Sequence, residues 1–114
     1  MKIDSYSFGS IIVNGKTYQK DIIVFPESVR PDWLRESRHS LTLNDLKEII
    51  DYRPDILIVG RGAYSGMTIP DSTKDELTIN QIQLIEADTK KACAIFNLHM
   101  KNKIKTVGAF HLTC

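Results

Sequence analysis

The stretch Asp55-Ile56-Leu57-Ile58-Val59-Gly60-Arg61-Gly62 decides the fold. Its four consecutive apolar residues, mostly β-branched, are typical of a strand that is covered on both faces. A strand with one face in water would instead alternate apolar and polar residues. The segment therefore predicts an interior strand of an α/β sheet, followed by a glycine-rich turn at the carboxyl end of that strand.

The elements after this strand alternate between helix and strand. Residues 70–79 can form a short helix, and residues 81–86 alternate as a strand. Asp88 can cap a second helix, and residues 106–113 form a closing strand. This order is that of βαβ units, whose strands pair in parallel.

The first half of the chain predicts further strands. An Asn14-Gly15 pair between residues 7–13 and 16–18 is a strong hairpin signal, because both turn positions need positive φ. Residues 21–25 form a third run, which Pro26 ends. We expect these three strands to form an additional N-terminal β layer.

Residues 26–40 follow neither a helical nor a strand period, which predicts an ordered loop, and residues 41–50 carry apolar side chains at helical spacing. The whole pattern indicates one α/β domain over residues 1–114. We expect three layers with a mixed, mostly parallel central sheet, plus the N-terminal β-hairpin layer.

Composition narrows the function class. The net charge is +1, from 15 Lys and Arg against 14 Asp and Glu, which argues against nucleic-acid binding. The longest apolar run, residues 56–59, is far too short to span a membrane, and residues 1–5 lack the apolar core of a signal peptide. We therefore expect a cytoplasmic protein.

Cys93 and Cys114 belong to no CxxC motif, so we expect two reduced thiols, no metal and no cofactor.

The glycine-rich turn is the first candidate site. Backbone N–H groups after a buried strand can hold an anion, and ligands favour the carboxyl ends of parallel strands. The candidate ligand-binding or anion-binding residues are Gly60, Arg61, Gly62, Ser65 and Gly66. Their spacing matches neither the dinucleotide fingerprint nor a P-loop. The alternative interpretation is a tight turn that needs small residues.

A second candidate site lies in the loop that precedes the first helix. Trp33, Arg35, Arg38 and His39 fall within seven residues, and Trp and Arg are enriched at protein interfaces. The competing interpretation is that Trp33 covers the edge of the core with Arg35 stacked on it.

The end of the chain carries a histidine and a cysteine, His111 and Cys114. Residues three apart in a regular strand face opposite sides, so the pair is not placed for nucleophilic catalysis. We expect these two side chains to pack rather than react.

Taken together, these residues resemble a known family. The motifs that carry the resemblance are Phe8-Gly9 with Gly15, Trp33 with Arg35, His39-Ser40-Leu41, Asp45-Leu46, Val59-Gly60-Arg61-Gly62 with Pro70, Thr89, Ala92, Phe96, Asn97, and the ending Ala109-Phe110-His111-Leu112-Thr113-Cys114. They are similar to the MTH-like domain family of unknown function. This family includes the adipogenesis-associated domain protein and, more distantly, the mitochondrial complex I assembly factor three. Many members carry Gly-Thr-Gly where this chain has Gly60-Arg61-Gly62.

The resemblance implies a three-layer fold around a mixed, mostly parallel sheet. It implies no catalytic activity or cofactor, and the better-known relatives resemble assembly or regulatory partners of other proteins. We therefore expect a non-enzymatic domain that binds an unknown protein partner and is a monomer or weak homo-oligomer. The alternative is a small-ligand or anion-binding domain, or an enzyme, that uses the loop at residues 60–66.

Overall fold

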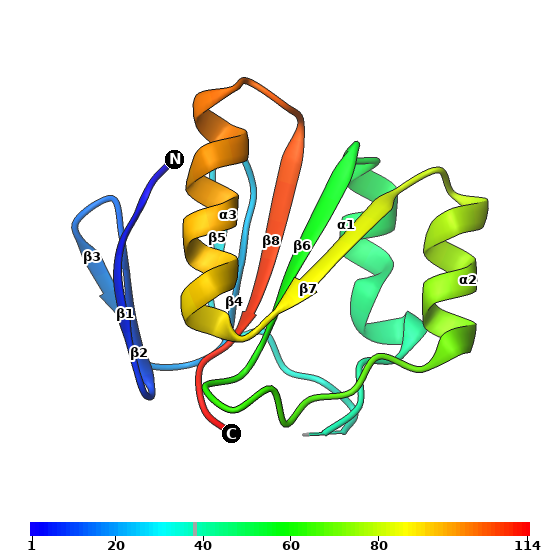
Figure 1. Cartoon of the computed structure of the whole chain (residues 1–114), viewed down its shortest axis with the longest axis horizontal. Helices are drawn as coiled ribbons and strands as arrows, with labels where there is room; N and C mark the ends of the chain where they lie inside the picture. The colour runs from blue at the N-terminus through cyan, green and yellow to red at the C-terminus, as the bar shows by residue number, and fades with distance from the viewer. Residues whose placement is uncertain (38) are drawn as a thin grey trace.

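The structure is a computed structural model that describes residues 1–37 and 39–114. Figure 1 shows its layers: a small N-terminal sheet, helix α3 (Thr89–Lys101), the main sheet, and then helices α1 (Lys47–Tyr52) and α2 (Asp71–Ile79) on the opposite face. Arg38, one of the predicted interaction residues, lies outside the described residues. The expected α/β architecture with an added N-terminal β layer is confirmed.

The five-stranded sheet has the order β5-β4-β8-β6-β7. Its strands are β4 (Ile22–Val24), β5 (Val29–Arg30), β6 (Ile56–Arg61), β7 (Gln83–Ala87) and β8 (Thr106–His111). Strand β6 runs parallel to both β7 and β8, whereas β4 is antiparallel to β8 and to β5. The sheet is therefore mixed, and β6 is the buried interior strand that its apolar run predicts.

The helices follow the predicted positions closely. They are the 3-10 turn η1 (Leu43–Leu46), α1 (Lys47–Tyr52), α2 (Asp71–Ile79) and α3 (Thr89–Lys101). The helix predicted over residues 41–50 thus begins as a 3-10 turn. Asp88 caps α3 as expected, because its side chain accepts a hydrogen bond of 3.0 Å from the backbone N–H of Lys91.

The small sheet consists of β1 (Ile3–Ser7), β2 (Ser10–Val13) and β3 (Lys16–Tyr18). The Asn14-Gly15 hairpin is confirmed, with Val13 paired to Lys16. The prediction of a single strand over residues 7–13 is wrong, because the chain turns at Phe8-Gly9, where Gly9 has φ of 78°.

The prediction that residues 21–25 belong to the N-terminal layer is also wrong. They form β4, which pairs with β8 in the five-stranded sheet. The physical reason is visible in the burial of this strand. Ile22 and Val24 pack towards α3, whereas Ile23 packs towards the opposite face, so β4 is covered on both sides like an interior strand.

Two hydrophobic cores lie on the two faces of the five-stranded sheet. One is shared with α3 and the small sheet, and the other with α1, α2 and the loops around Trp33 and Met67. Gly108 makes room for the first core, since a Cβ there would lie 2.5 Å from the ring of Phe110 and 2.8 Å from that of Phe96. The carboxamide of Asn97 on α3 docks the small sheet, because it accepts from the N–H of Ile3 and donates to the carbonyl of Ile3.

Candidate functional site around His111

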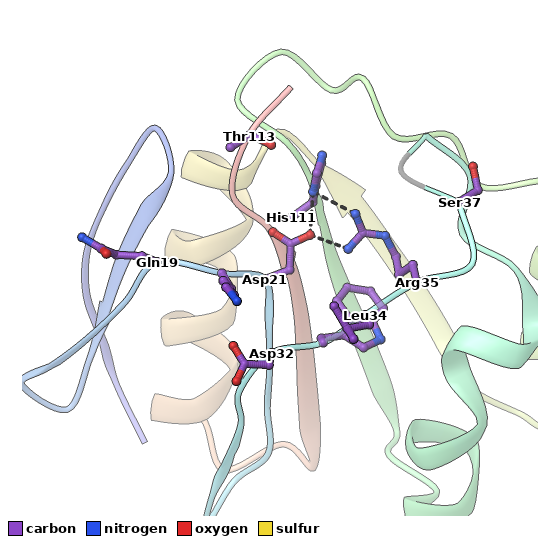
Figure 2. Close-up of a pocket in the computed structure, with 10 residues that line it drawn as sticks. Gln19, Asp21, Asp32, Leu34, Arg35, Ser37, His111 and Thr113 are labelled. Carbon is purple, nitrogen blue, oxygen red and sulfur yellow. Dashed lines mark hydrogen bonds and ion pairs between the residues drawn. The ribbon is translucent and has the colours of Figure 1, made fainter.

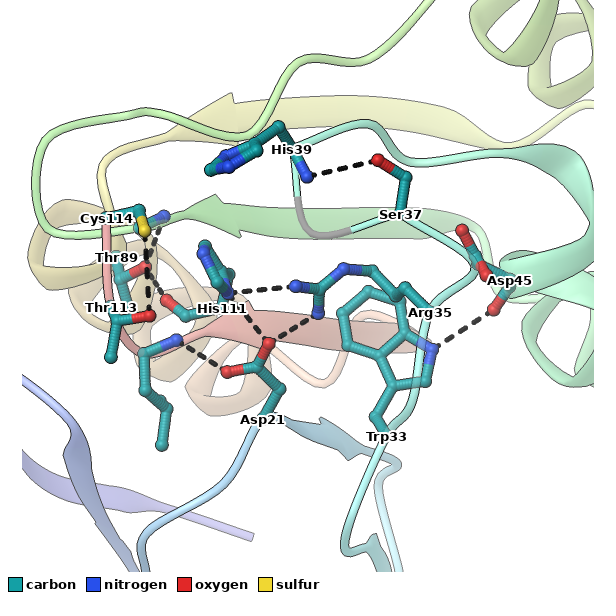
Figure 3. Close-up of polar contacts among 12 residues, drawn as sticks. Asp21, Trp33, Arg35, Ser37, His39, Asp45, Thr89, His111, Thr113 and Cys114 are labelled. Carbon is teal, nitrogen blue, oxygen red and sulfur yellow. Dashed lines mark hydrogen bonds and ion pairs between the residues drawn. The ribbon is translucent and has the colours of Figure 1, made fainter.

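Three charged or ionisable side chains from distant parts of the chain meet at the carboxyl end of β8. Nδ1 of His111 lies 2.7 Å from Oδ2 of Asp21, and Nη1 of Arg35 donates to the same oxygen. The other Asp21 oxygen accepts the backbone N–H of Leu112 at 2.8 Å. Figure 3 shows Asp21 between the other two side chains, so the carboxylate joins the start of β4, the end of β8 and the loop that holds Trp33.

This cluster is largely withdrawn from solvent. The side chains of Arg35 and His111 are each 5% exposed, and that of Asp21 is 16% exposed. Burial alone would raise the pKa of Asp21, but the hydrogen bonds from His111, Arg35 and Leu112, with the charge of Arg35, hold this pKa below its ordinary value. Asp21 is therefore an ionised carboxylate inside the domain.

The loop before η1 positions the arginine. Trp33 is buried, and its indole N–H donates to the carbonyl of Asp45 at 3.2 Å. The guanidinium of Arg35 lies over the Trp33 ring, 4.9 Å from the ring centroid. Trp33 also donates its backbone N–H to the carbonyl of Asp21 at 2.8 Å. The structure thus confirms that Trp33 covers the edge of the core with Arg35 stacked on it.

A pocket of about 300 Å³ opens next to this cluster. Its wall includes the three clustered side chains, and Figure 2 shows them with Leu34 and Thr113 around the same space.

Nδ1 of His111 has two neighbours of opposite hydrogen-bonding character. Nη2 of Arg35 lies 3.0 Å from this atom, and the Asp21 carboxylate, which can only accept, lies closer at 2.7 Å. Arg35 can only donate, so Nδ1 can donate to Asp21 in one tautomer of His111 and accept from Arg35 in the other. Within the described residues, Nε2 has no hydrogen-bond partner. This atom is also buried, so a bound molecule could reach it only if neighbouring residues moved.

The glycine-rich loop lies against the C-terminal residues of the same chain. Gly66 donates its N–H to the carbonyl of Cys114 at 2.9 Å, and Ala63 donates to the carbonyl of Thr113 at 3.3 Å. Side chains on Gly62 or Gly66 would overlap those carbonyls. The glycines therefore permit a close approach of two backbone segments. An external anion at this loop would have to displace residues 113 and 114, and its binding there stays a prediction.

Two further side chains hold this loop. Arg61 donates from Nε to the carbonyl of Met67 at 2.7 Å, and its Nη1 lies 3.3 Å from Glu86. The buried hydroxyl of Thr89 accepts the N–H of Gly62 at 2.9 Å and donates to the carbonyl of His111. Thr89 thus ties the ends of β6 and β8 together.

The predicted site residues fall into two groups in space. The Trp33 loop and His111 meet in one cluster, whereas Gly62 and Gly66 pack on the terminal segment with Cys114 and Gly60 faces Thr89 and Phe110. His39 is exposed, and the interaction role of this loop stays a prediction. His111 and Cys114 do not contact each other through a hydrogen bond, and both cysteines are free thiols as expected.

Sequence reasoning missed Asp21, which holds the cluster together. The only signal is a charged residue directly before an apolar strand, and this signal gains meaning only once β4 is known to pair with β8. Over the described ranges 1–37 and 39–114, no group of three His, Cys, Asp or Glu side chains is arranged to hold a metal ion. None of the helices within those ranges has the length and apolar character to cross a membrane.

The fold is shared with solved structures of low sequence identity. The conserved hypothetical protein PH1505 from Pyrococcus horikoshii OT3 matches with a TM-score of 0.82 and 24% identity, covering 100% of both chains. A Bordetella pertussis protein that is described as a Mth938-like domain matches with a TM-score of 0.73 and 18% identity over 97% of this chain and 85% of that one. The Rpa2829 protein from Rhodopseudomonas palustris has a TM-score of 0.77 and 21% identity over 96% and 81% of the two chains.

The sequence itself matches a family over residues 3–111, nearly its whole length. That family is described as protein of unknown function, DUF498/DUF598. The predicted resemblance to MTH-like domains is therefore confirmed by both sequence and fold. This chain belongs to the DUF498/DUF598 family of Mth938-like domains.

Proposed function

We propose that this domain is a non-enzymatic, cytoplasmic protein-binding module whose partner docks on the loops at the carboxyl ends of its parallel strands. One observation carries the proposal. Three large apolar side chains are strongly exposed on three separate loops: Phe8 is 61% exposed, Leu34 84% and Tyr64 83%.

The three loops are held around one short segment, residues 111–114. The turn with Phe8 bonds to it, since Gly9 donates its N–H to the carbonyl of Leu112 at 2.9 Å. The loop with Tyr64 bonds to it through Ala63 and Gly66, and Leu34 lines the same pocket as Thr113.

An exposed leucine or phenylalanine alone needs no explanation. Three exposed side chains on loops that all contact residues 111–114 do need one. Apolar and aromatic groups gathered at one end of a domain mark interaction surfaces. The buried Asp21–Arg35–His111 cluster supports this interpretation. It fixes the Leu34 loop to β8 and so presents Leu34 on a rigid support.

The test compares two sets of surface variants in affinity capture from cells of the source organism. The triple variant Phe8→Ser, Leu34→Ser, Tyr64→Ser removes the proposed surface. The control Leu43→Ser, Leu98→Ser removes exposed leucines that lie on η1 and α3. We expect one protein to be recovered with the native chain and the control and lost with the triple variant. Recovery of no stable partner, or equal recovery by both variants, would contradict the proposal.

A second candidate function is the binding of a small molecule, and the pocket of about 300 Å³ beside Asp21, Arg35 and His111 favours it. A thermal-shift screen against nucleotides, phosphates and acyl metabolites tests it. A ligand at a hundred times its Kd adds about 2.7 kcal/mol to the free energy of unfolding. Amide shifts at Asp21 and Arg35 would place the ligand in the pocket, and shifts at Gly62 and Gly66 would place it in the glycine-rich loop. A screen without any stabilising compound would remove this candidate.

A further inference from the structure

The free edge of the five-stranded sheet is formed by β7, and it differs from the opposite edge. Strand β5 at the other edge has two residues, lies between Pro26 and Pro31, and carries Arg30. Short strands, prolines and charges are the features that keep sheet edges from pairing. Strand β7 has five residues, Gln83–Ala87, with no proline and no lysine, and its one charged residue, Glu86, is paired with Arg61 and Lys74.

The backbone of β7 offers hydrogen-bonding groups on its outer side. Gln83 donates its N–H inward to the carbonyl of Asp55 at 3.0 Å. Because backbone groups alternate in direction along a strand, those of Ile85 and Ala87 also face β6, and those of Leu84 and Glu86 face outward. In the described part of the chain, no strand pairs with that outer side.

A groove of about 490 Å³ runs beside this edge, between β7 and α2. Lys74 and Thr78 of α2 form one wall, and Leu84 and Glu86 of β7 form the other. Lys74 lies 3.3 Å from Glu86, which Arg61 also contacts, so an ion pair joins the two walls of the groove. Half-buried Leu84 and buried Ile82 provide apolar contact surface.

We propose that this groove binds an extended segment of a partner protein, which adds to the sheet as a sixth strand beside β7. The outward backbone groups of Leu84 and Glu86 would bond the segment, and alternate apolar side chains of the segment would enter the groove. A single strand is favoured over a second copy of this domain. Helix α2 borders the edge on one face, and a groove with a helical wall admits one strand more readily than a whole sheet.

The surface is separate from the one proposed above, because the groove has no lining residue in common with the loops of Phe8, Leu34 and Tyr64. The groove should also select its partner segment by a sequence pattern. The segment should have apolar residues at alternate positions, since successive side chains of a strand point to opposite faces. It should contain no proline where its N–H groups face β7.

The experiment selects random seven-residue peptides, displayed on phage, against the full chain, and then titrates the best peptide by NMR. We expect the selected peptides to alternate apolar and polar residues. We also expect the amides of Leu84 and Glu86 to shift and to exchange at least tenfold more slowly with the peptide bound. Thr78→Trp, at an exposed position in the groove wall, should abolish binding, whereas Ser72→Trp, exposed on the same helix but outside the groove, should not.

Other outcomes would overturn the proposal. Peptides that bind equally to both variants, or that shift the Phe8 and Tyr64 amides instead, would place recognition elsewhere. Protection of Leu84 and Glu86 that depends on protein concentration alone would show that a second copy occupies the edge. Failure to select any peptide would mean that the edge does not accept a strand. The amide shifts and protection of Leu84 and Glu86 do not depend on whether the loops around residues 111–114 bind a partner.

Discussion

His111 and Asp21, 90 residues apart in sequence, lie 2.7 Å from each other between Nδ1 and Oδ2. Through this contact the last strand of the sheet is joined to the residue that precedes β4, and Arg35 extends the contact to the loop over the core. Ionised Asp21 is therefore the electrostatic centre of one end of the domain.

Acid should weaken the fold through Asp21. The pKa of Asp21 is lowered in the folded state from its ordinary value of 3.8. The ionised form thus stabilises the fold above pH 3.8, and this stabilisation is lost as the pH falls through that value towards the folded-state pKa. We expect Asp21→Asn to lower the free energy of unfolding by about 2–4 kcal/mol at pH 7 and by less at pH 3, where part of the stabilisation by the ionised carboxylate is already lost. Urea unfolding at both pH values measures this, and equal losses would contradict the assigned role.

The close approach of the glycine-rich loop to the terminal segment should be measurable as stability. Gly62 has φ of 107°, and a Cβ there would overlap the backbone oxygen of Thr113. Gly15 also has positive φ, at 80°, but its Cβ would meet nothing within 4 Å. Gly15→Ala should therefore cost only the backbone strain, about 1–2 kcal/mol. Gly62→Ala should cost about 1–3 kcal/mol more. Thermal unfolding of both variants provides the comparison. Equal losses of stability would mean that the glycine-rich loop can move to accommodate the added Cβ of Gly62→Ala.

The two cysteines should differ in alkylation. Burial, with a smaller effect of Asp88, raises the pKa of Cys93 to about 12, so its reactive thiolate is scarce at neutral pH. Cys114 is partly exposed. We expect iodoacetamide, followed by mass spectrometry, to modify Cys114 first and Cys93 only under unfolding conditions. Fast reaction of Cys114 near pH 6 that His111→Ala abolishes would contradict the prediction that these two side chains pack rather than react.

The docking of the small sheet should depend on one carboxamide. Asn97 satisfies both the N–H and the carbonyl of Ile3, so Asn97→Ala leaves two backbone groups of β1 without a side-chain partner. We expect a loss of about 1–3 kcal/mol in the free energy of unfolding, with faster amide exchange confined to residues 3–18. Lys101→Ala, at an exposed position on the same helix, is the control. Unchanged exchange in Asn97→Ala would show that apolar packing alone holds the small sheet.

The sequence predicts most of the fold because its signals are local. The apolar run of β6, the Asn14-Gly15 hairpin and the cap of α3 at Asp88 each depend on neighbouring residues, and all three are confirmed. The position of β4 could not be predicted in this way. Residues 21–25 have the composition of a strand in either sheet, and only pairing with a strand far along the chain decides between them.

The candidate site could likewise be predicted only where its signals are local. His111, Trp33 and Arg35 could be singled out by residue type, but the residue that joins them, Asp21, could not. The sequence predicts an anion-binding loop at Gly62 and Gly66. In the structure, the groups that closely approach these glycines are the chain's own carbonyl groups. A glycine pattern indicates that something comes near the backbone, and it does not say what.

The pairing of β4 with β8 also constrains how the chain reaches its native state. Residues 22–24 are synthesised early, yet the strand that pairs with them, residues 106–111, is synthesised late. Synthesis adds about 5–20 residues per second. During that interval, Ile22, Ile23 and Val24 have no native neighbour in the centre of the sheet. Such long-range pairings slow folding because a large loop must close before any contact forms. We therefore expect this apolar segment to lack its β8 partner for several seconds of synthesis, while β5 alone is available to pair with it.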